Sequence, residues 1–477
     1  LHPHQGIAAP DRPVQAQVWG LGRVVALEHP DRWGGLVDLP ETLDERAGGR
    51  LPSVLAGCGE DQVAVSAAGI LGCRLTRASQ PSATENGWAP RGTTLITGGT
   101  GAIAGHVSRW LADRGASRLV LTGRSGPEAT GVAATVADLA ERGAAVDVVA
   151  CDASDRSSLA GLLDWTAASG PALSAVMHTA GVLDDGVVDR LSAERLATVL
   201  TAKATSAALL DELTSGLDLD AFVLFSSAAA VLGTAGQGNY AAANAHLDAL
   251  AENRRSRGLA GLSVAWGAWA GGGLADTSDA VRARVGRGAM PPMDPELAVR
   301  ALGEALTDSH PALTVMDVDW PQLAATPGAA DFRDMPLVRD LPEIRRLAAA
   351  LPAAGSAVPA EGELARRLAG MNRAEQDRTL EDLVRAEAAT VLGHATPAAI
   401  GPAQALNEVG FDSLTAVELR NRVSTVTGLR LPATLLFDYP SPVVLVDHLR
   451  VTLLGALADA AAAPAAPAAS SAADDEP

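Results

Sequence analysis

Tyr240, Asn244, Ser227 and Lys203 are the side chains of this sequence whose combination could do chemistry. Lys203 is the single lysine among 37 basic residues, and Tyr240 is one of only two tyrosines. Tyr240 and Asn244 are four residues apart, so they share one face of a helix. A phenol with a pKa of about 10 donates a proton poorly at neutral pH unless a cation lowers that pKa. With Lys203 as the cation, the set could protonate the alkoxide that forms when a ketone is reduced.

Each of these residues also has an ordinary structural interpretation. Tyr240 could be a packed aromatic residue with its hydroxyl at the surface, Ser227 a cap at the end of a strand, and Lys203 a solvated helix residue. The conjunction of the sole lysine, a rare tyrosine and a serine, all downstream of a nucleotide-binding motif, favours catalysis.

That motif is the glycine-rich segment Gly99-Thr100-Gly101-Ala102-Ile103-Ala104, which follows a predicted strand and opens a predicted helix. Its small residues would let the backbone approach a pyrophosphate, although the same pattern occurs in ordinary glycine turns. At the end of the next predicted strand, Arg124 stands where an NAD enzyme has an acidic residue, and an arginine suits the 2′-phosphate of NADP. NADPH is therefore the expected cofactor.

The elements that position these residues are strands that alternate with helical segments. Apolar strands are predicted at 94–97, 119–122, 146–149, 175–178 and 222–225. Such strands suit a parallel sheet covered by helices on both faces, so the expected fold class is an α/β doubly wound, Rossmann-like domain. Cofactors bind at the carboxyl ends of such strands. The predicted contacts are Thr97, Gly98, Gly99, Thr100, Gly101, Ala102, Ile103, Arg124, Ser125, Asp152, Ala153, Thr179, Ala180 and Gly181.

A second, all-helical domain is predicted toward the C-terminus. Apolar residues recur at helical spacing in 378–393, 413–427 and 441–455, which is enough for a small helix bundle. Ser413 begins the second of these segments, where a helix-capping serine is the common interpretation. The expected domains are a structural part (1–89), a nucleotide-binding part (90–325), a linker rich in Pro, Ala and Arg (326–375), the helical domain (376–455) and a flexible tail (456–477).

Composition argues against several other classes of protein. A net charge of −19 disfavours a nucleic-acid groove, which needs a basic stripe. No apolar run reaches the roughly 18 residues that a membrane-spanning helix needs, and no secretory signal opens the sequence, so a cytoplasmic location is expected. Cys58, Cys73 and Cys151 lack metal-ligand spacing, so neither a metal site nor a disulfide framework is expected.

Thr97-Gly98-Gly99-Thr100-Gly101 and the catalytic set together resemble the ketoreductase domains of modular type I polyketide synthases, within the short-chain dehydrogenase superfamily. In that family an asparagine occupies the fourth position after the tyrosine, where most superfamily members have lysine. The resemblance implies that NADPH supplies a hydride and that Tyr240 protonates the substrate oxygen. It further implies that Ser227 hydrogen-bonds this oxygen, Lys203 tunes Tyr240 and holds the ribose, and Asn244 completes the relay. Residues 1–89 resemble the cofactorless structural half of these reductases, without its beginning.

Leu183-Asp184-Asp185 resembles the signature of B-type ketoreductases, which form a D-configured hydroxyl. Leu232 stands where A-type enzymes have a tryptophan. Ala243 stands where epimerising B-type domains have proline, so no inversion at the α-carbon is expected. These expectations follow from the resemblance, because three residues of a loop do not reveal the handedness of a reaction by themselves.

The segment from Val409 to Arg422, with Phe437-Asp438-Tyr439-Pro440-Ser441-Pro442 beyond it, resembles polyketide acyl carrier domains. This implies that Ser413 carries 4′-phosphopantetheine and presents a β-ketoacyl thioester substrate, with Tyr439 structural. The expected partners are the ketosynthase and acyltransferase domains of the same synthase, a following ketosynthase and a phosphopantetheinyl transferase, but no nucleic acid or membrane. Asp475-Glu476-Pro477 resembles the start of that following ketosynthase.

Two other functions compete with this interpretation. The reductase fold could be an inactive scaffold for the carrier, but the intact catalytic set argues against that function. A free-standing short-chain dehydrogenase for small alcohols, fused to an unrelated helical tail, is disfavoured by the motif around Ser413.

Overall fold

A computed structural model describes residues 12–78, 87–272, 289–325, 332, 335–350, 363–392, 396–406, 409, 411, 413–429, 431–432 and 435–462. The chain divides into two compact units, Leu1–Pro352 and Ala353–Pro477. Among the described residues, no helix is both long and apolar enough to cross a membrane.

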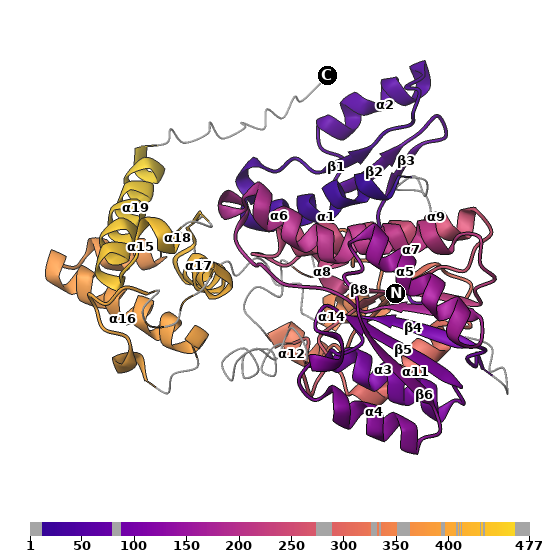
Figure 1. Ribbon diagram of the computed structural model, residues 1–477. Helices are drawn as coiled ribbons and strands as arrows, with labels where there is room; N and C mark the ends of the chain where they lie inside the picture. The colour runs from indigo at the N-terminus through magenta and orange to yellow at the C-terminus, as the bar shows by residue number, and fades with distance from the viewer. Residues whose placement is uncertain are drawn as a thin grey trace. The chain divides into compact units, whose positions relative to one another are not determined.

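A seven-stranded parallel sheet forms the centre of the first unit (Figure 1). Its order is β10-β9-β8-β7-β4-β5-β6. The strands are β4 (Thr93–Thr97), β5 (Arg118–Gly123), β6 (Ala145–Ala150), β7 (Leu173–His178), β8 (Ala221–Ser227), β9 (Leu262–Trp266) and β10 (Ala312–Val315). The order reverses between β4 and β7, where Thr97 lies beside His178. In such a sheet the ligand crevice lies at this reversal, beyond the carboxyl ends of the strands.

The five predicted strands correspond to β4 to β8, and the doubly wound α/β fold is confirmed. Strands β9 and β10 are additions to the prediction. They contain five and four residues, and apolar runs this short do not distinguish a strand from a helix by periodicity.

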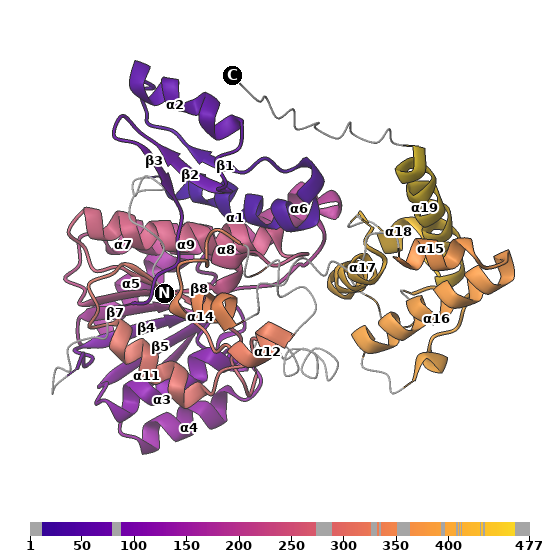
Figure 2. The same ribbon diagram turned by 180° about the vertical axis from the view of Figure 1, so that it is seen from behind.

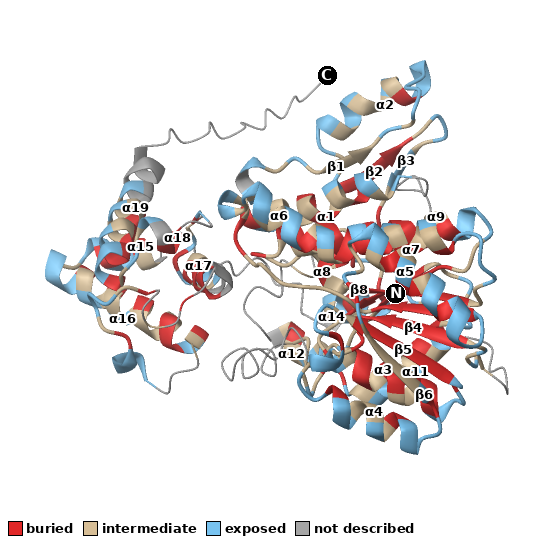
Figure 3. Cartoon of the chain, viewed as in Figure 1, coloured by how far each residue is buried: buried red, intermediate tan, exposed pale blue. Residues whose placement is uncertain are grey.

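Helices cover both faces of the sheet, and Figure 3 shows the buried strands between them. One face carries α3 (Ala102–Asp113), α4 (Val132–Glu141) and α11 (Pro295–Ala305). The other carries α5 (Arg156–Ser169), α7 (Ser206–Thr214) and α9 (Gly238–Ser256). Leu111, Leu139 and Leu302 belong to the buried cluster on the first face, and Leu159 and Leu247 to that on the second. Shorter elements near the site are η3 (Val188–Arg190), α6 (Ala193–Leu200), the π-helix η4 (Thr201–Thr205) and α8 (Ala228–Leu232).

The N-terminal part of this unit adds a long helix and a small sheet. Its elements are α1 (Pro13–Glu28), η1 (Pro30–Arg32), β1 (Leu36–Asp38), α2 (Glu45–Leu55), β2 (Gln62–Val65) and β3 (Ile70–Gly72), with strand order β1-β2-β3. Figure 2 shows α1 alongside α9, and the two helices are in close contact. A Cβ atom on Gly20 of α1 would collide with the carbonyl of Ala241 in α9. Glycine at this position therefore lets the structural part approach the helix that carries Tyr240.

The second unit is a helix bundle. It contains α15 (Glu363–Ala369), α16 (Arg373–Leu392), η5 (Pro397–Ala399), α17 (Ser413–Thr427), α18 (Leu435–Asp438) and α19 (Pro442–Ala462). Leu380, Leu419 and Leu449 belong to its buried core, so the three predicted helical segments pack as expected.

Residues 326–375, interpreted from composition as a linker, contain α14 (Pro342–Ala350) in addition to α15. Ile344 of α14 joins a buried cluster of the first unit, whereas Leu368 of α15 joins the core of the second. Both of these helices are therefore packed, although the composition of the range is rich in Pro and Ala.

Candidate active site

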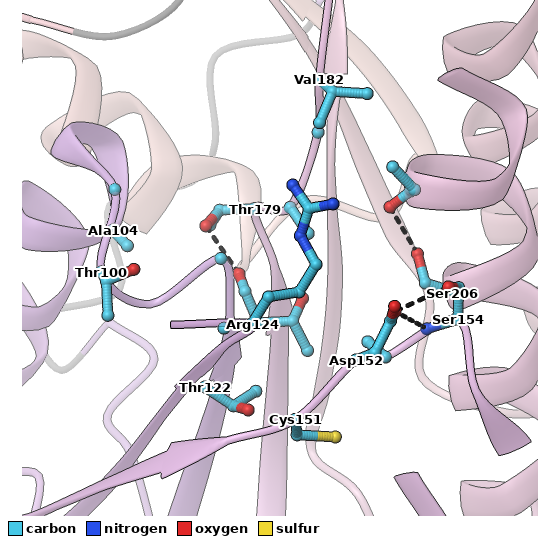
Figure 4. Close-up of a pocket in the computed structure, with 18 of the residues that line it drawn as sticks. Thr100, Ala104, Thr122, Arg124, Cys151, Asp152, Ser154, Thr179, Val182 and Ser206 are labelled. Carbon is cyan, nitrogen blue, oxygen red and sulfur yellow. Dashed lines mark hydrogen bonds between the residues drawn. The ribbon is translucent and has the colours of Figure 1, made fainter. Parts of the chain in front are cut away.

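A cavity of about 730 Å³ lies beyond the carboxyl ends of β4, β5 and β7 (Figure 4). All the predicted cofactor contacts except Gly99 line it. Thr198, Thr201 and Ala202, from α6 and η4, also line it but were not predicted, since no sequence motif marks them. The cavity occupies the point where the strand order reverses, as expected for a nucleotide site.

The glycines of the motif let the loop after β4 approach its neighbours closely. Gly98 has a φ of +68°, and a Cβ atom on it would lie 2.7 Å from the backbone nitrogen of Ala180. Gly99 is behind the cavity, where a Cβ atom would lie 2.8 Å from Cα of Leu121 in β5. Within the described ranges, no side chain caps the start of α3, which follows Gly101. Its free N–H groups therefore fit the diphosphate of a dinucleotide.

Substitution Gly98→Ala should weaken dinucleotide binding by about tenfold or more, because the methyl group would displace the Ala180 backbone at the cavity wall. Gly115→Ala is a matched control, since Gly115 has a φ of +86° but no heavy atom within 4 Å of its Cβ position. Titration of both variants with NADPH, monitored by the fluorescence of the nucleotide, measures the difference in affinity. Equal affinities in the two variants would contradict a requirement for close approach at Gly98.

Arg124 follows β5, Asp152 follows the adjacent strand β6, and both residues line the cavity. In Figure 4 the exposed Arg124 side chain extends among the lining residues, with Thr179 on one side and Asp152 on the other. Asp152 Oδ1 accepts hydrogen bonds from Ser154 Oγ at 2.6 Å and Ser154 N at 2.9 Å. These bonds, and more weakly the charge of Arg124, lower the pKa of Asp152. This end of the cavity thus offers a carboxylate beside an available guanidinium.

Lys203 lies on the π-helix η4, a local irregularity of the kind often found at functional sites. The side chain is buried, and its Nζ donates a 2.6 Å hydrogen bond to the carbonyl of Phe225 in β8. The Nζ atom lies 5.7 Å from the centroid of the Tyr240 ring. A Cβ atom on Gly181, which lines the cavity, would lie 3.0 Å from Lys203 Cε. Lys203 therefore connects the cavity to Tyr240.

Burial has the largest effect on the pKa of Lys203 and on that of Tyr240. Burial lowers the pKa of Lys203 to about 7, while the charge of Asp248 opposes this shift. Burial also raises the pKa of Tyr240, while hydrogen bonding with Asn244 and Ser227 opposes that shift. Desolvation of the phenolate therefore outweighs the polar contacts of Tyr240.

Ser227 and Asn244 complete the predicted set. Ser227 caps α8, its Oγ accepting a 3.2 Å hydrogen bond from Ala229 N, so the strand-end cap suggested as its structural role does occur. The hydroxyl proton is not used in that bond and is available to a substrate oxygen. Asn244 Nδ2 donates to the carbonyl of Tyr240 at 2.8 Å. Its buried Oδ1 has no hydrogen-bond partner among the described residues, an arrangement that suits a proton relay through water.

His178 holds the parts of the site together, a role that the sequence does not reveal. Its ring is fully buried, and burial lowers its pKa to about 3, so it is neutral. Nε2 donates to the carbonyl of Lys203 at 3.0 Å. Because a carbonyl only accepts, Nδ1 is the unprotonated nitrogen, and it accepts from Thr97 Oγ1 at 2.7 Å. His178 thereby links the end of β4 to the turn that carries Lys203.

The loop containing Leu183, Asp184 and Asp185 packs against α6 and the start of α9. Asp184 Oδ1 accepts from Arg195 Nε at 2.8 Å, and the Asp184 carbonyl accepts from Asn239 Nδ2 at 2.8 Å. Asp185 Oδ2 accepts from Gln237 Nε2 at 2.8 Å. The predicted stereocontrol loop is therefore adjacent in space to Tyr240, and Arg195, Gln237 and Asn239 were missed because they have no motif of their own.

In the second unit, Ser413 is the first residue of α17. A helix N-terminus favours the negative charge of an attached phosphodiester. Tyr439 stacks on His448, with ring centroids 4.0 Å apart. This packing agrees with a structural role for Tyr439 and leaves Tyr240 as the tyrosine beside the cavity.

Comparison with known families agrees with this division of the chain. Residues 92–271 match the KR domain family, and residues 382–449 match the phosphopantetheine attachment site family. Residues 3–75 match the Rossmann fold domain of the polyketide synthase extender module SpnB. These matches support the two expected cofactors, a nicotinamide dinucleotide for the first unit and phosphopantetheine for the second.

Similar whole proteins are much longer than this chain. It is 53% identical over 461 residues to polyketide synthase GfsA of Streptomyces halstedii, covering 95% of this chain and 6% of that protein. It is 46% identical over 453 residues to the pikromycin synthase component PikAIII of Streptomyces venezuelae, covering 93% of this chain and 29% of that protein.

The matches to solved structures cover a much larger share of the other chain. One described as A-type ketoreductases from a modular polyketide synthase is 48% identical, with a TM-score of 0.66 and 70% coverage of both chains. A C2-type ketoreductase from a modular polyketide synthase is 45% identical, with a TM-score of 0.63, covering 69% of this chain and 70% of that one. The geometry of the cavity, the family matches and these likenesses lead to one conclusion: the chain belongs to the modular polyketide synthases and comprises a ketoreductase domain followed by a phosphopantetheine-binding carrier domain.

Proposed function

We propose that this chain uses NADPH to reduce a β-ketoacyl thioester, tethered to Ser413 through phosphopantetheine, to a D-β-hydroxyacyl thioester without epimerisation. The observation that carries the proposal is the position of Lys203, which is adjacent both to Tyr240 and to the cavity-lining Gly181. A proton donor beside a dinucleotide cavity is the arrangement that ketone reduction requires.

When bound in this cavity, the dinucleotide would supply a hydride to the β-carbon. The Tyr240 hydroxyl donates its proton to the carbonyl oxygen, and Ser227 donates a hydrogen bond to the same oxygen. A buried lysine with a pKa of about 7 exchanges a proton readily near neutral pH, so Lys203 can return a proton to Tyr240. The Oδ1 of Asn244, which has no hydrogen-bond partner in the described part of the chain, would hold the water that links this relay to solvent.

The choice of NADPH over NADH rests on Arg124. Its guanidinium is exposed at the end of β5, next to the cavity. An arginine there can form a bidentate interaction with the 2′-phosphate that only NADPH carries.

The D configuration rests on Leu183, Asp184 and Asp185. The hydrogen bonds of this loop to Arg195, Gln237 and Asn239 support a role in orienting substrate beside Tyr240. The similar solved structures include A-type and C2-type ketoreductases, so overall similarity does not decide the type. Leu232 and Ala243 support the B-type, non-epimerising assignment through the resemblance described above.

We further propose that the chain works in the cytoplasm with ketosynthase and acyltransferase domains of one synthase, passes its product to a downstream ketosynthase, and is loaded by a phosphopantetheinyl transferase. Tethering substrate to the same chain replaces dilute encounter with a high effective concentration. The inactive-scaffold alternative is not favoured, because the catalytic set is intact and Lys203 lies between Tyr240 and the cavity-lining Gly181.

The test is NADPH oxidation by the purified chain with a β-ketoacyl thioester, followed by chiral analysis of the product. A D-hydroxy product with the starting α-configuration is expected, together with slower turnover when NADH replaces NADPH. An L-hydroxy product would refute the B-type assignment but not the reductase. Lack of turnover in a folded sample would favour the scaffold function.

A further inference from the structure

The last residue of α1 contributes a buried carboxylate to the surroundings of the active site. Glu28 is 1% exposed. Its Oε2 accepts a 2.7 Å hydrogen bond from the backbone N–H of Val188, and its Oε1 accepts a 2.6 Å hydrogen bond from the backbone N–H of Gly236. The donors lie 160 and 208 residues away in sequence, so one side chain of the structural part joins two separate segments of the catalytic part.

These two segments are those that border Tyr240. Val188 lies three residues after Asp185, and Gly236 lies four residues before Tyr240. The segments also contact each other directly, because Gly186 N donates to the carbonyl of Gly236 at 2.7 Å. Glu28 therefore connects the loop proposed to orient substrate with the start of the helix that carries the proton donor.

The position of Glu28 does not benefit its own helix. A carboxylate at the C-terminus of a helix is disfavoured by the helix dipole, and burial adds a desolvation cost. Burial raises the pKa of Glu28, while the N–H groups of Gly236 and Val188 and the neighbouring His29 lower it and Asp189 raises it. His29 Nε2 lies 3.5 Å from Asp189 Oδ1. The opposite effects of these two residues on the pKa of Glu28 therefore partly cancel. The two backbone hydrogen bonds are thus the interactions that offset the cost of burying this group.

We propose that Glu28 is a positioning residue of the ketoreductase: by accepting both N–H groups, it sets the distance between the Asp184-Asp185 loop and the start of α9. Through this contact the part of the chain that binds no dinucleotide shapes the substrate side of the active site. The inference rests on the proposed function for its effect on catalysis, but the contact itself can be tested separately.

Glu28→Gln tests the proposal because the amide has nearly the same shape but only one acceptor oxygen, so one of the two N–H groups loses its partner. Glu41→Gln is the control, since Glu41 lies in the same part of the chain with its side chain 84% exposed. We expect Glu28→Gln to lower kcat/KM for the β-ketoacyl thioester by about tenfold or more and to change the ratio of hydroxyl enantiomers. NADPH affinity should remain that of the unaltered chain, because the cavity lining includes neither loop end bonded by Glu28.

Hydrogen–deuterium exchange separates this proposal from the proposed function. In Glu28→Gln, amides in 183–190 and 234–240 should exchange faster, while those of α3 should not change. Faster exchange in both segments supports the positioning role even if the unaltered chain proves inactive, an outcome that would count against the proposed function alone. Unchanged exchange in both segments, or faster exchange with the original kcat/KM and enantiomer ratio, would overturn the role assigned to Glu28.

Discussion

Replacement of Tyr240 by phenylalanine should reduce ketoreduction by about two to four orders of magnitude, the usual contribution of a positioned general acid. The substitution removes only the phenolic oxygen, and the remaining ring can still pack beside Lys203, whose Nζ is 5.7 Å from the ring centroid. Tyr240 does not line the dinucleotide cavity. NADPH affinity should therefore be nearly unchanged, and the loss should appear in kcat.

The measurement is NADPH oxidation with a soluble β-ketoacyl thioester, combined with a fluorescence titration of NADPH. Tyr439→Phe is the matched control, because it removes the other phenolic oxygen from a ring that stacks on His448 in the carrier domain. Retained turnover in Tyr240→Phe would refute the assignment of Tyr240 as proton donor. An equal loss in both variants would point to a nonspecific effect on folding.

Replacement of Ser413 by alanine should abolish attachment of phosphopantetheine, because alanine has no oxygen to form the phosphoester. Alanine is the most favourable residue in a helix, so α17, which Ser413 begins, should persist. Intact-mass analysis after incubation with coenzyme A and a phosphopantetheinyl transferase measures the adduct. Reduction of a soluble thioester should continue, since the substitution lies in the other compact unit.

Ser441→Ala is the control for this experiment. Ser441 also lies in the carrier domain, immediately before α19, and should leave the adduct intact. An adduct on Ser413→Ala would place the attachment site elsewhere. No adduct on the unaltered chain, when a known carrier domain is modified in parallel, would refute the carrier assignment.

The sequence by itself predicted the fold class and nearly all of the residues named for the nucleotide cavity. The apolar strands and the motif from Gly99 to Ala104 predict the nucleotide cavity, because local spacing and glycine content dictate where a backbone can approach a phosphate. The rarity of lysine and tyrosine singled out Lys203 and Tyr240 as candidates, since a chain with one lysine offers few ways to bring an ammonium and a phenol together. The helical spacing after Ser413 likewise predicted α17.

Only the tertiary structure decided how these residues are held. The π-helix at Lys203, the neutral His178 between Thr97 and the Lys203 carbonyl, and the carboxylate of Glu28 all depend on contacts between residues far apart in the chain. Burial raises the pKa of Tyr240, an effect that the sequence does not reveal, because burial is a property of the packed domain. Local pattern specifies elements and motifs, whereas desolvation and long-range hydrogen bonds exist only once the elements have packed together.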